Sequence, residues 1–249
     1  MVDLEKLRKI QKEDFLGWDF SDINAKTVSK PLPWDYKKVI GQYLNREDLL
    51  LDMGTGGGEF LLSLEHPYEN TYVTEAYPPN IKLCEQRLVP LGITLFKNKE
   101  NQAHIPSQIL FDVIINKHDE YHPEEVYKGL KEGGYFITQQ VGGKNNQELS
   151  KALLGYSYKD FSKDTWDLAH ARKNLENVGF DILCAEEVFS SVKYVDLETI
   201  VAYASIIEWE FPGFDVDKNA RELAQIEGVL QDKGYIEGQE HRFLLICKK

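Results

Sequence analysis

The sequence predicts an α/β protein in which a mostly parallel sheet is wrapped by helices on both faces. Two observations predict this class. Short apolar runs alternate with helix-like segments through the middle of the chain, which is the pattern of a parallel sheet covered by helices. The first apolar run passes directly into a glycine-rich turn and then into a helical segment, as in a βα unit that binds a ligand.

Seven strands are predicted, and each is a short apolar run bounded by turn or helix signals. They span 49–53, 71–76, 93–97, 109–116, 134–141, 181–189 and 241–249. Pro78 and Pro79 indicate a helix that begins there and continues to Leu88, because proline is tolerated in a first helical turn. Further helices are expected at 123–131 and in the stretch that ends at Gly179.

Two segments do not fit this alternation, and we interpret them as additions to a single domain that spans 1–249. The first is an N-terminal arm at 1–45, predicted to be helical, and the second is an insertion at 190–238 before the last strand. The arm is rich in large aromatic residues, which a loose terminus does not need. They either attach the arm to the core or form part of a lid over a substrate, and both roles are compatible.

Composition narrows the class of partner. The chain has 29 Lys and Arg against 41 Asp and Glu, a net charge of -12, so nucleic acid would meet a mostly repulsive surface. A small-molecule partner is favoured.

Three distant cysteines without ligand spacing indicate neither disulfides nor a metal site. No signal peptide and no apolar run of about 18 residues is found, so we expect a cytoplasmic protein that does not enter a membrane. The sequence does not indicate an oligomeric state.

The sharpest motif is LLLDMGTGGGEF, in which Asp52, Gly54, Gly56 and Gly58 lie between a predicted strand and a predicted helix. Glycines let the backbone turn sharply and approach a ligand, and the amides at the helix start point toward it. The dinucleotide fingerprint GxGxxG fails at its third glycine, where Glu59 stands. No Gly-Lys-Ser or Gly-Lys-Thr follows, which disfavours a kinase-type phosphate loop.

The motif resembles the DxGxGxG signature of class I S-adenosylmethionine-dependent methyltransferases. The resemblance implies a Rossmann-like sheet of seven strands with an antiparallel last strand. It also implies that Asp52 and the loop residues from Gly54 through Thr55 and Gly56 to Gly58 bind S-adenosylmethionine. In this family a carboxylate after the second strand binds the ribose hydroxyls. Glu75, with the adjoining Ala76, stands at that point.

Further parts of the cofactor and acceptor site follow from the same resemblance. A polar side chain after the third strand contacts the adenine amino group, which points to Asn101, by its spacing from Pro106, and to Gln102. Asn116 ends the fourth strand at the methyl-donor pocket, and His118 follows it. His118 is a candidate general base or acceptor-orienting group, because histidine titrates near neutral pH.

The resemblance implies in-line transfer of a methyl group to a small-molecule acceptor that the sequence does not identify. Trp18, Trp34, Tyr36 and His118 are candidates for the acceptor pocket, because the two added segments would cover the methyl group. One alternative is a protein that uses the same fold to bind the cofactor or a partner without catalysis. A second alternative is an NAD-dependent oxidoreductase, which shares the strand, the loop and Glu75.

Overall fold

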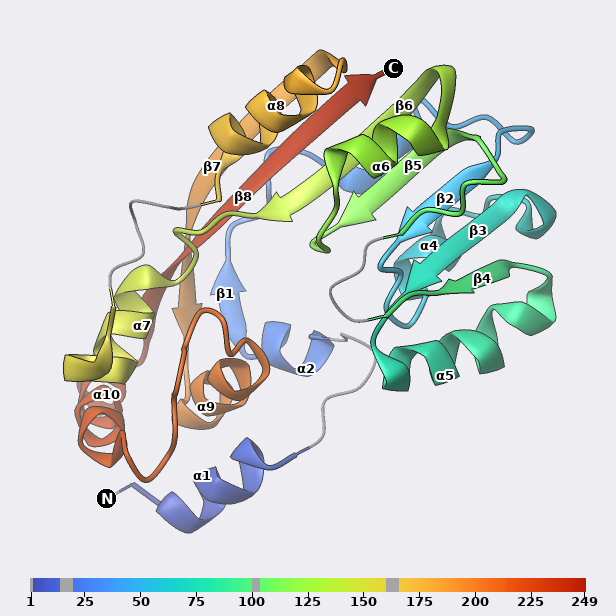
Figure 1. Ribbon diagram of the computed structural model, residues 1–249. Helices are drawn as coiled ribbons and strands as arrows, with labels where there is room; N and C mark the ends of the chain where they lie inside the picture. Colours follow the sequence, from blue (N-terminus) through green and yellow to red (C-terminus); the bar gives the residue numbers. More distant parts are fainter. Residues whose placement is uncertain (1, 14–19, 100–103, 160–165) are drawn as a thin grey trace.

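The computed structural model describes residues 2–13, 20–99, 104–159 and 166–249, and an eight-stranded sheet lies at its centre (Figure 1). The strand order is β1-β7-β8-β6-β5-β2-β3-β4. In chain order the strands are β1 (Thr27–Ser29), β2 (Leu50–Met53), β3 (Thr71–Glu75), β4 (Thr94–Lys97), β5 (Phe111–Lys117), β6 (Leu130–Val141), β7 (Asp181–Tyr194) and β8 (Ile236–Lys248).

Strands β2 to β6 are parallel to one another, and β8 lies antiparallel between β6 and β7. The predicted fold class, a mostly parallel sheet with an antiparallel last strand and helices on both faces, is therefore confirmed. One strand of the eight, β1, was not predicted. It pairs antiparallel with the end of β7, with Thr27 opposite Tyr194. Its three residues are too few to show an alternating pattern.

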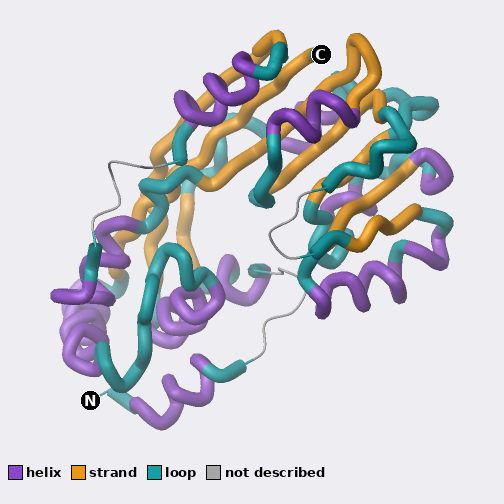
Figure 2. Tube along the Cα trace, in the orientation of Figure 1, coloured by secondary structure: helices purple, strands orange, loops and turns teal. Residues whose placement is uncertain are grey.

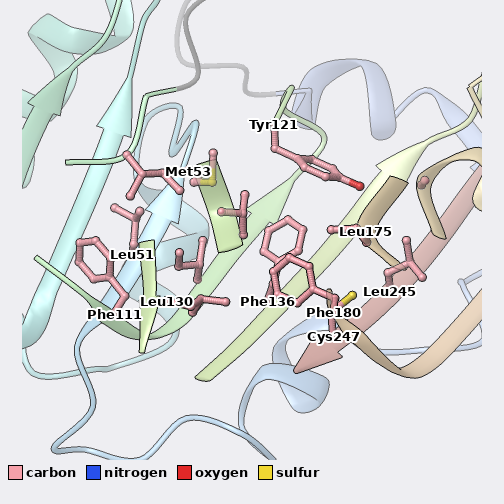
Figure 3. Packing of buried hydrophobic residues seen from close by; sticks show 14 of the residues in the cluster. Leu51, Met53, Phe111, Tyr121, Leu130, Phe136, Leu175, Phe180, Leu245 and Cys247 are labelled. Carbon is pink, nitrogen blue, oxygen red and sulfur yellow. The ribbon is translucent and has the colours of Figure 1, made fainter. Parts of the chain in front are cut away.

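Each face of the sheet carries its own hydrophobic core, because neighbouring residues of a strand point to opposite faces. On one face Leu51, Phe111 and Phe136 pack beneath α6 (Pro123–Gly129) and α8 (Leu168–Asn177), as Figure 3 shows. On the other, Leu50 and Ile115 pack beneath α3 (Tyr36–Ile40), α4 (Glu59–Ser63) and α5 (Pro78–Arg87). Burial on both faces explains why the central strands are continuous apolar runs.

A third hydrophobic core lies outside the two-faced sheet. It joins α1 (Leu4–Gln11), α7 (Gln147–Leu154), α9 (Leu197–Ile206) and α10 (Ala220–Lys233) to the adjoining ends of β7 and β8. We call these four helices the cap (Figure 2). In Figure 1 the cap lies on the side toward which the parallel strands point. Arg8 of α1 forms an ion pair with Asp217, which links the N-terminal helix to the segment before α10.

Strands β7 and β8 are longer than predicted, and their pairing runs from Asp181 opposite Lys248 to Tyr194 opposite Ile236. The segment 190–238 therefore contains the end of β7, then α9, α10 and the start of β8. The described part of the chain also contains the short helix α2 (Ser21–Asn24) and 3-10 turns at Tyr68–Asn70, Val89–Leu91 and Gly155–Ser157. Among the residues described, no helix is both long and apolar enough to cross a bilayer.

Candidate functional site

The glycine-rich loop connects β2 to α4 at the carboxyl end of the sheet. Gly54 and Gly56 have φ angles of 63°, and Gly58, which precedes α4, has a φ of 82°. These left-handed conformations favour glycine. A Cβ atom on Gly54 would lie 2.2 Å from Oδ2 of Asp119. The loop therefore needs glycine both for its backbone angles and for its contact with the end of β5.

Glu75 ties the end of β3 to this loop. Its Oε2 accepts a hydrogen bond from the amide of Gly56 at 2.8 Å. Its Oε1 accepts from the amides of Ala76 at 2.8 Å and Tyr77 at 2.9 Å. The side chain is buried, at 6% exposure. Two predicted site residues, Glu75 at the end of β3 and Ala76 directly after it, thus lie against the glycine loop.

Three carboxyl groups lie beside the loop: Asp52 of β2, Glu75 of β3, and Asp119 from the segment after β5. Asp52 is the last but one residue of the buried strand β2. Burial raises its pKa to about 7; Thr55 and Lys117 oppose this increase, and Asp119 and Glu75 add to it. Burial also raises the pKa of Asp119 to about 6, again with a contribution from Glu75. Two of the three groups, Asp52 and Glu75, are buried. Carboxyl groups that lie close together away from water resist ionisation until a cation joins them. This cluster, which we call the carboxyl cluster, favours a positively charged ligand.

Asn116 lies at the centre of the sheet where β5 ends, and it is fully buried. Its Oδ1 accepts hydrogen bonds from Gln140 Nε2 at 2.6 Å and from Thr138 Oγ1 at 3.3 Å. No hydrogen-bond acceptor among the described residues contacts its Nδ2. A buried donor without a partner is costly, so this amide has a free donor for a ligand at the carboxyl end of β5.

His118 follows β5 and has a φ of 66°, which is unusual for a residue other than glycine. Its backbone amide donates to the carbonyl of Gln139 at 2.9 Å. Its Nε2 lies 3.0 Å from Nε2 of Gln139, and Oε1 of that amide accepts from Trp34 Nε1 at 2.8 Å. The three side chains form one chain of hydrogen bonds, which we call the relay, across β5, β6 and the N-terminal arm.

Two cations act on the His118 imidazole. Burial lowers its pKa well below the usual value, and the charges of Arg242 and Lys117 lower it further. The residue nevertheless keeps an exposed surface. His118 is therefore neutral near pH 7.

Tyr36 lies beneath the sheet rather than in the open part of the site. Its hydroxyl contacts the carbonyl oxygens of Ile137 at 2.8 Å and Asn116 at 3.0 Å. Its ring stacks on Phe60, with ring centres 5.4 Å apart. The side chain is only 6% exposed. Tyr36 thus fixes the start of α3 against β5 and β6 at the level of Asn116.

Tyr36→Phe should lower the free energy of unfolding by about 1–2 kcal/mol, because two buried carbonyls lose a hydrogen-bond donor. Urea unfolding measures this loss. Tyr156→Phe is the matched control, since Tyr156 is 96% exposed and its hydroxyl has no such burial. Equal losses in the two variants would contradict the assigned contacts.

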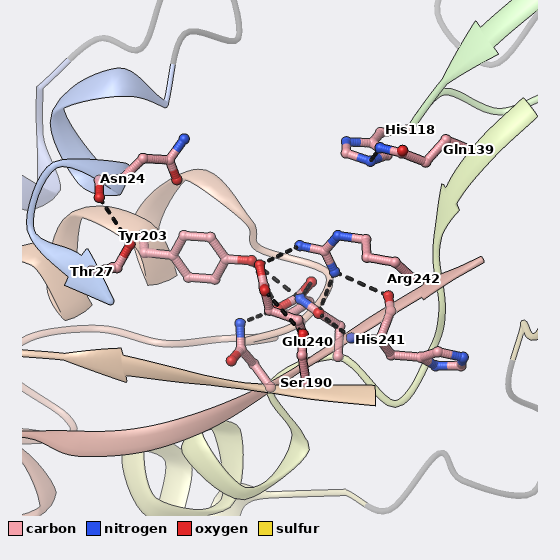
Figure 4. A network of polar contacts seen from close by, with 12 residues as sticks. Asn24, Thr27, His118, Gln139, Ser190, Tyr203, Glu240, His241 and Arg242 are labelled. Carbon is pink, nitrogen blue, oxygen red and sulfur yellow. Dashed lines mark hydrogen bonds and ion pairs between the residues drawn. The ribbon is translucent and has the colours of Figure 1, made fainter. Parts of the chain in front are cut away.

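A second polar network lies where β6 ends, beside residues 240–242 of β8. Asn145 and Asn146 donate to the carboxylate of Glu210, at 2.7 and 3.3 Å. Burial raises the pKa of Glu210. Arg242 donates to Oδ1 of Asn145 at 2.5 Å and to Glu240 at 3.3 Å. Figure 4 draws this network together with the pair of His118 and Gln139.

A cavity of about 350 Å³ opens beside this network. Its walls include Gly142, Asn145, Trp166 and Trp209, with Glu210 among the polar residues. The larger rings give it a mostly apolar lining, which is typical of a small-molecule pocket. None of the residues of the carboxyl cluster lines this cavity. The cavity and the cluster are therefore two separate places at the edge of the sheet where the parallel strands end.

The structure brings most of the predicted site residues together. Asp52, Gly54, Thr55, Gly56 and Gly58 form the strand end and the loop, and Glu75 and Ala76 lie against it. Asn116, His118, Trp34 and Tyr36 meet at the ends of β5 and β6. Trp18, Asn101 and Gln102 lie outside the described residues. Among the residues that the structure describes, no group of three His, Cys, Asp or Glu side chains could hold a metal ion.

Sequence reasoning missed Asp119, Gln139 and Arg242 as parts of the site. The two consecutive glutamines at the end of the predicted strand 134–141 were an available signal, because polar side chains there stand where parallel strands meet a ligand. Arg242 carries no such signal, since it belongs to the antiparallel strand β8.

No protein-family model matches the sequence, and no curated protein matches it. Among solved structures, a protein of unknown function from Deinococcus radiodurans R1 superimposes with a TM-score of 0.60 at 12% identity, covering 89% of this chain and 90% of that one. A candidate methyltransferase from Bacillus halodurans C-125 has a TM-score of 0.58 at 15% identity, covering 86% and 98%. The [4+2]-cyclase SpnF has a TM-score of 0.50 at 14% identity, covering 98% and 91%.

These likenesses extend over most of each chain at low identity, so they bear on the fold and not on the activity. The chain therefore has the α/β fold of the class I methyltransferases.

Proposed function

We propose that the protein binds S-adenosylmethionine across the carboxyl ends of β2, β3 and β5 and transfers its methyl group to a small-molecule acceptor. The carboxyl cluster carries this proposal. Asp52 and Asp119 have raised pKa values because burial and neighbouring carboxylates disfavour their ionisation. A ligand that brings a positive charge relieves this cost. When bound, S-adenosylmethionine supplies such a charge, and its sulfonium makes the methyl carbon electrophilic.

The residues present fit this cofactor in two further respects. The glycine loop brings backbone without side chains to the place where the adenosyl group would approach. The Nδ2 donor of Asn116 has no partner among the described residues and lies at the strand end next to Lys117. In this proposal Oε2 of Glu75, which accepts a single backbone amide, also accepts a ribose hydroxyl, while the bonds of Glu75 to Gly56 and Ala76 hold the loop in position.

The protein's own contribution to the reaction would be positioning and exclusion of water. Alignment at attack distance lowers the barrier without a nucleophile on the enzyme. The cap lies on the same side of the sheet as the proposed cofactor site (Figure 1), so it is suited to cover the reacting atoms. The carboxyl cluster would also favour the cationic substrate over the product, S-adenosylhomocysteine, which lacks the sulfonium charge. That difference supports product release.

A small acceptor agrees with the size and charge of the molecule. The cavity of about 350 Å³ beside Trp166 and Trp209 is large enough for a compact organic molecule. The net charge of -12 disfavours nucleic acid. The identity of the acceptor and the atom that is methylated stay open.

Calorimetric titration of the purified protein with S-adenosylmethionine, S-adenosylhomocysteine and NAD tests the cofactor. We expect both adenosyl compounds to bind. Glu75→Gln should weaken them at least about tenfold, because a charged hydrogen-bond acceptor contributes about 1.5–3 kcal/mol. Glu69→Gln makes the same chemical change at an exposed position before β3 and should leave the affinity unchanged.

Two results would overturn this assignment. Binding of NAD alone would indicate the oxidoreductase alternative, although Glu59 stands at the third glycine of the dinucleotide fingerprint. Binding of none of the three compounds would indicate a protein that kept the fold without the cofactor.

A second candidate is a reaction other than methyl transfer on the same scaffold. The observation that supports this candidate is the structural likeness to the [4+2]-cyclase SpnF, which covers 98% of this chain. Transfer of a labelled methyl group from S-adenosylmethionine to any member of an acceptor library distinguishes the two. Cofactor binding without any transfer would favour the second candidate.

A further inference from the structure

The chemistry of the Trp34 side chain fixes the direction of every hydrogen bond in the relay. An indole nitrogen only donates, so the atom of Gln139 that faces Trp34 at 2.8 Å is the oxygen, Oε1. The amide group of Gln139 then turns its NH₂ toward His118, at 3.0 Å from Nε2. That ring nitrogen must accept. A neutral imidazole that accepts at Nε2 carries its hydrogen on Nδ1.

The backbone fixes the orientation of the same ring. Gln139 accepts from the amide of His118 through its carbonyl at 2.9 Å, and it also holds the side chain. His118 keeps a left-handed φ of 66°, a conformation that costs energy in a residue with a side chain. Strain of this kind persists where the surroundings determine one geometry, so the ring is held in a single direction.

The Nδ1–H group is available to a ligand. Among the described residues, no side chain or carbonyl accepts a hydrogen bond from it, while the residue keeps an exposed surface. The two charges that shift the His118 pKa most are the cations of Arg242 and Lys117. An N–H group can only donate, so it binds an oxygen acceptor and not an ammonium group, and the two cations add to this preference.

We propose that the Nδ1–H of His118 is the hydrogen-bond donor of an acceptor-side subsite that binds a carboxylate or carbonyl oxygen, with Trp34 and Gln139 as positioning residues. The proposal deepens the proposed function, since it names the chemical group by which the methyl acceptor is held. It also gives Trp34 a role through its N–H group and not only through its ring. Base catalysis by Nε2 would first require that the contact with Gln139 be broken.

Nitrogen NMR of the protein labelled at histidine reads the tautomer directly and needs no cofactor. We expect wild type to show His118 mainly as the Nδ1–H tautomer near pH 7. Gln139→Glu should invert it, because a carboxylate oxygen would now face Nε2 and require a hydrogen there. Trp34→Phe keeps an aromatic ring at this position but removes the N–H donor. The amide of Gln139 can then turn, and the Nε2–H tautomer should become detectable.

Gln86→Glu adds the same charge on the exposed side of α5 and should leave the His118 signals unchanged. An Nε2–H tautomer or an imidazolium ion in wild type near pH 7 would overturn the assignment. Unchanged His118 signals in Gln139→Glu would also overturn it, because the relay would then not set the tautomer.

The ligand class is tested by titrating sodium acetate and methylammonium chloride in parallel, with the His118 signals as readout. We expect acetate, and not methylammonium, to shift the Nδ1–H resonance in a saturable way, and to do so less in Gln139→Glu. A saturable response to methylammonium, or none to acetate, would overturn the ligand class. Because neither probe is the cofactor, these outcomes are independent of whether S-adenosylmethionine binds in calorimetry.

Discussion

Gly54→Ala should weaken binding of S-adenosylmethionine about 100-fold, because each hydrogen bond to a charged group that the site loses contributes about 1.5–3 kcal/mol. The added Cβ would lie 2.2 Å from Oδ2 of Asp119. Either Asp119 leaves the carboxyl cluster or the loop moves and carries the amide of Gly56 away from Glu75. Both adjustments remove groups that the proposed cofactor site needs. Calorimetric titration measures the change.

Gly213→Ala is the control for the backbone alone. Gly213 has a φ of 76°, and a Cβ there would meet nothing within 4 Å. It carries the same left-handed penalty, about 1–2 kcal/mol, without the collision. We expect Gly213→Ala to lower the thermal stability and leave the affinity unchanged. A similar loss of affinity in both variants would show that the space beside Gly54 is not used.

Affinity for S-adenosylmethionine should rise with pH between about pH 5 and pH 8, by up to about tenfold per pH unit. The pKa values of Asp52 and Asp119, about 7 and about 6, place them partly protonated in this range. A bound sulfonium favours the ionised carboxylates, so binding releases protons and strengthens as the proton concentration falls. S-adenosylhomocysteine lacks that charge and should show a shallower slope.

Asp52→Asn tests the origin of this dependence. The amide cannot ionise, so the pH slope for S-adenosylmethionine should flatten and the affinity above about pH 8 should fall. The ligand-free protein should respond in the opposite sense. Because the pKa of Asp52 is raised on folding, its contribution to stability is lost as pH rises through about 7. The variant should therefore be more stable than wild type at alkaline pH, and an unchanged pH slope would exclude Asp52 from the linkage.

The strands of the central sheet could be predicted because each is buried on both faces. Runs such as the one that ends at Met53 contain almost only apolar residues, and the adjoining glycines mark where the strand stops. Their positions in the structure differ from the prediction by only a few residues. The strand 134–141 begins earlier, at Leu130, because the expected helix before it ends at Gly129.

The cap could not be predicted in the same way. The helix Gln147–Leu154 lies in a segment that reads as polar, and its buried residues Leu149 and Leu153 pack against α10 and β8. Strands β7 and β8 extend into the cap because they pair with each other over their whole length. Pairing between segments some 50 residues apart leaves no local periodicity in either of them.

The sequence by itself determined the class of the fold, the glycine loop after the first core strand, and the acidic residues Asp52 and Glu75 at neighbouring strand ends. These features are local, since each depends on a short run of residues and on the rule that parallel strands present their carboxyl ends at one edge. Only the tertiary structure decided which atom of His118 is free. Gln139 and Trp34 stand 21 and 84 positions from it along the chain, and the protonation of an imidazole depends on the groups that surround it in space.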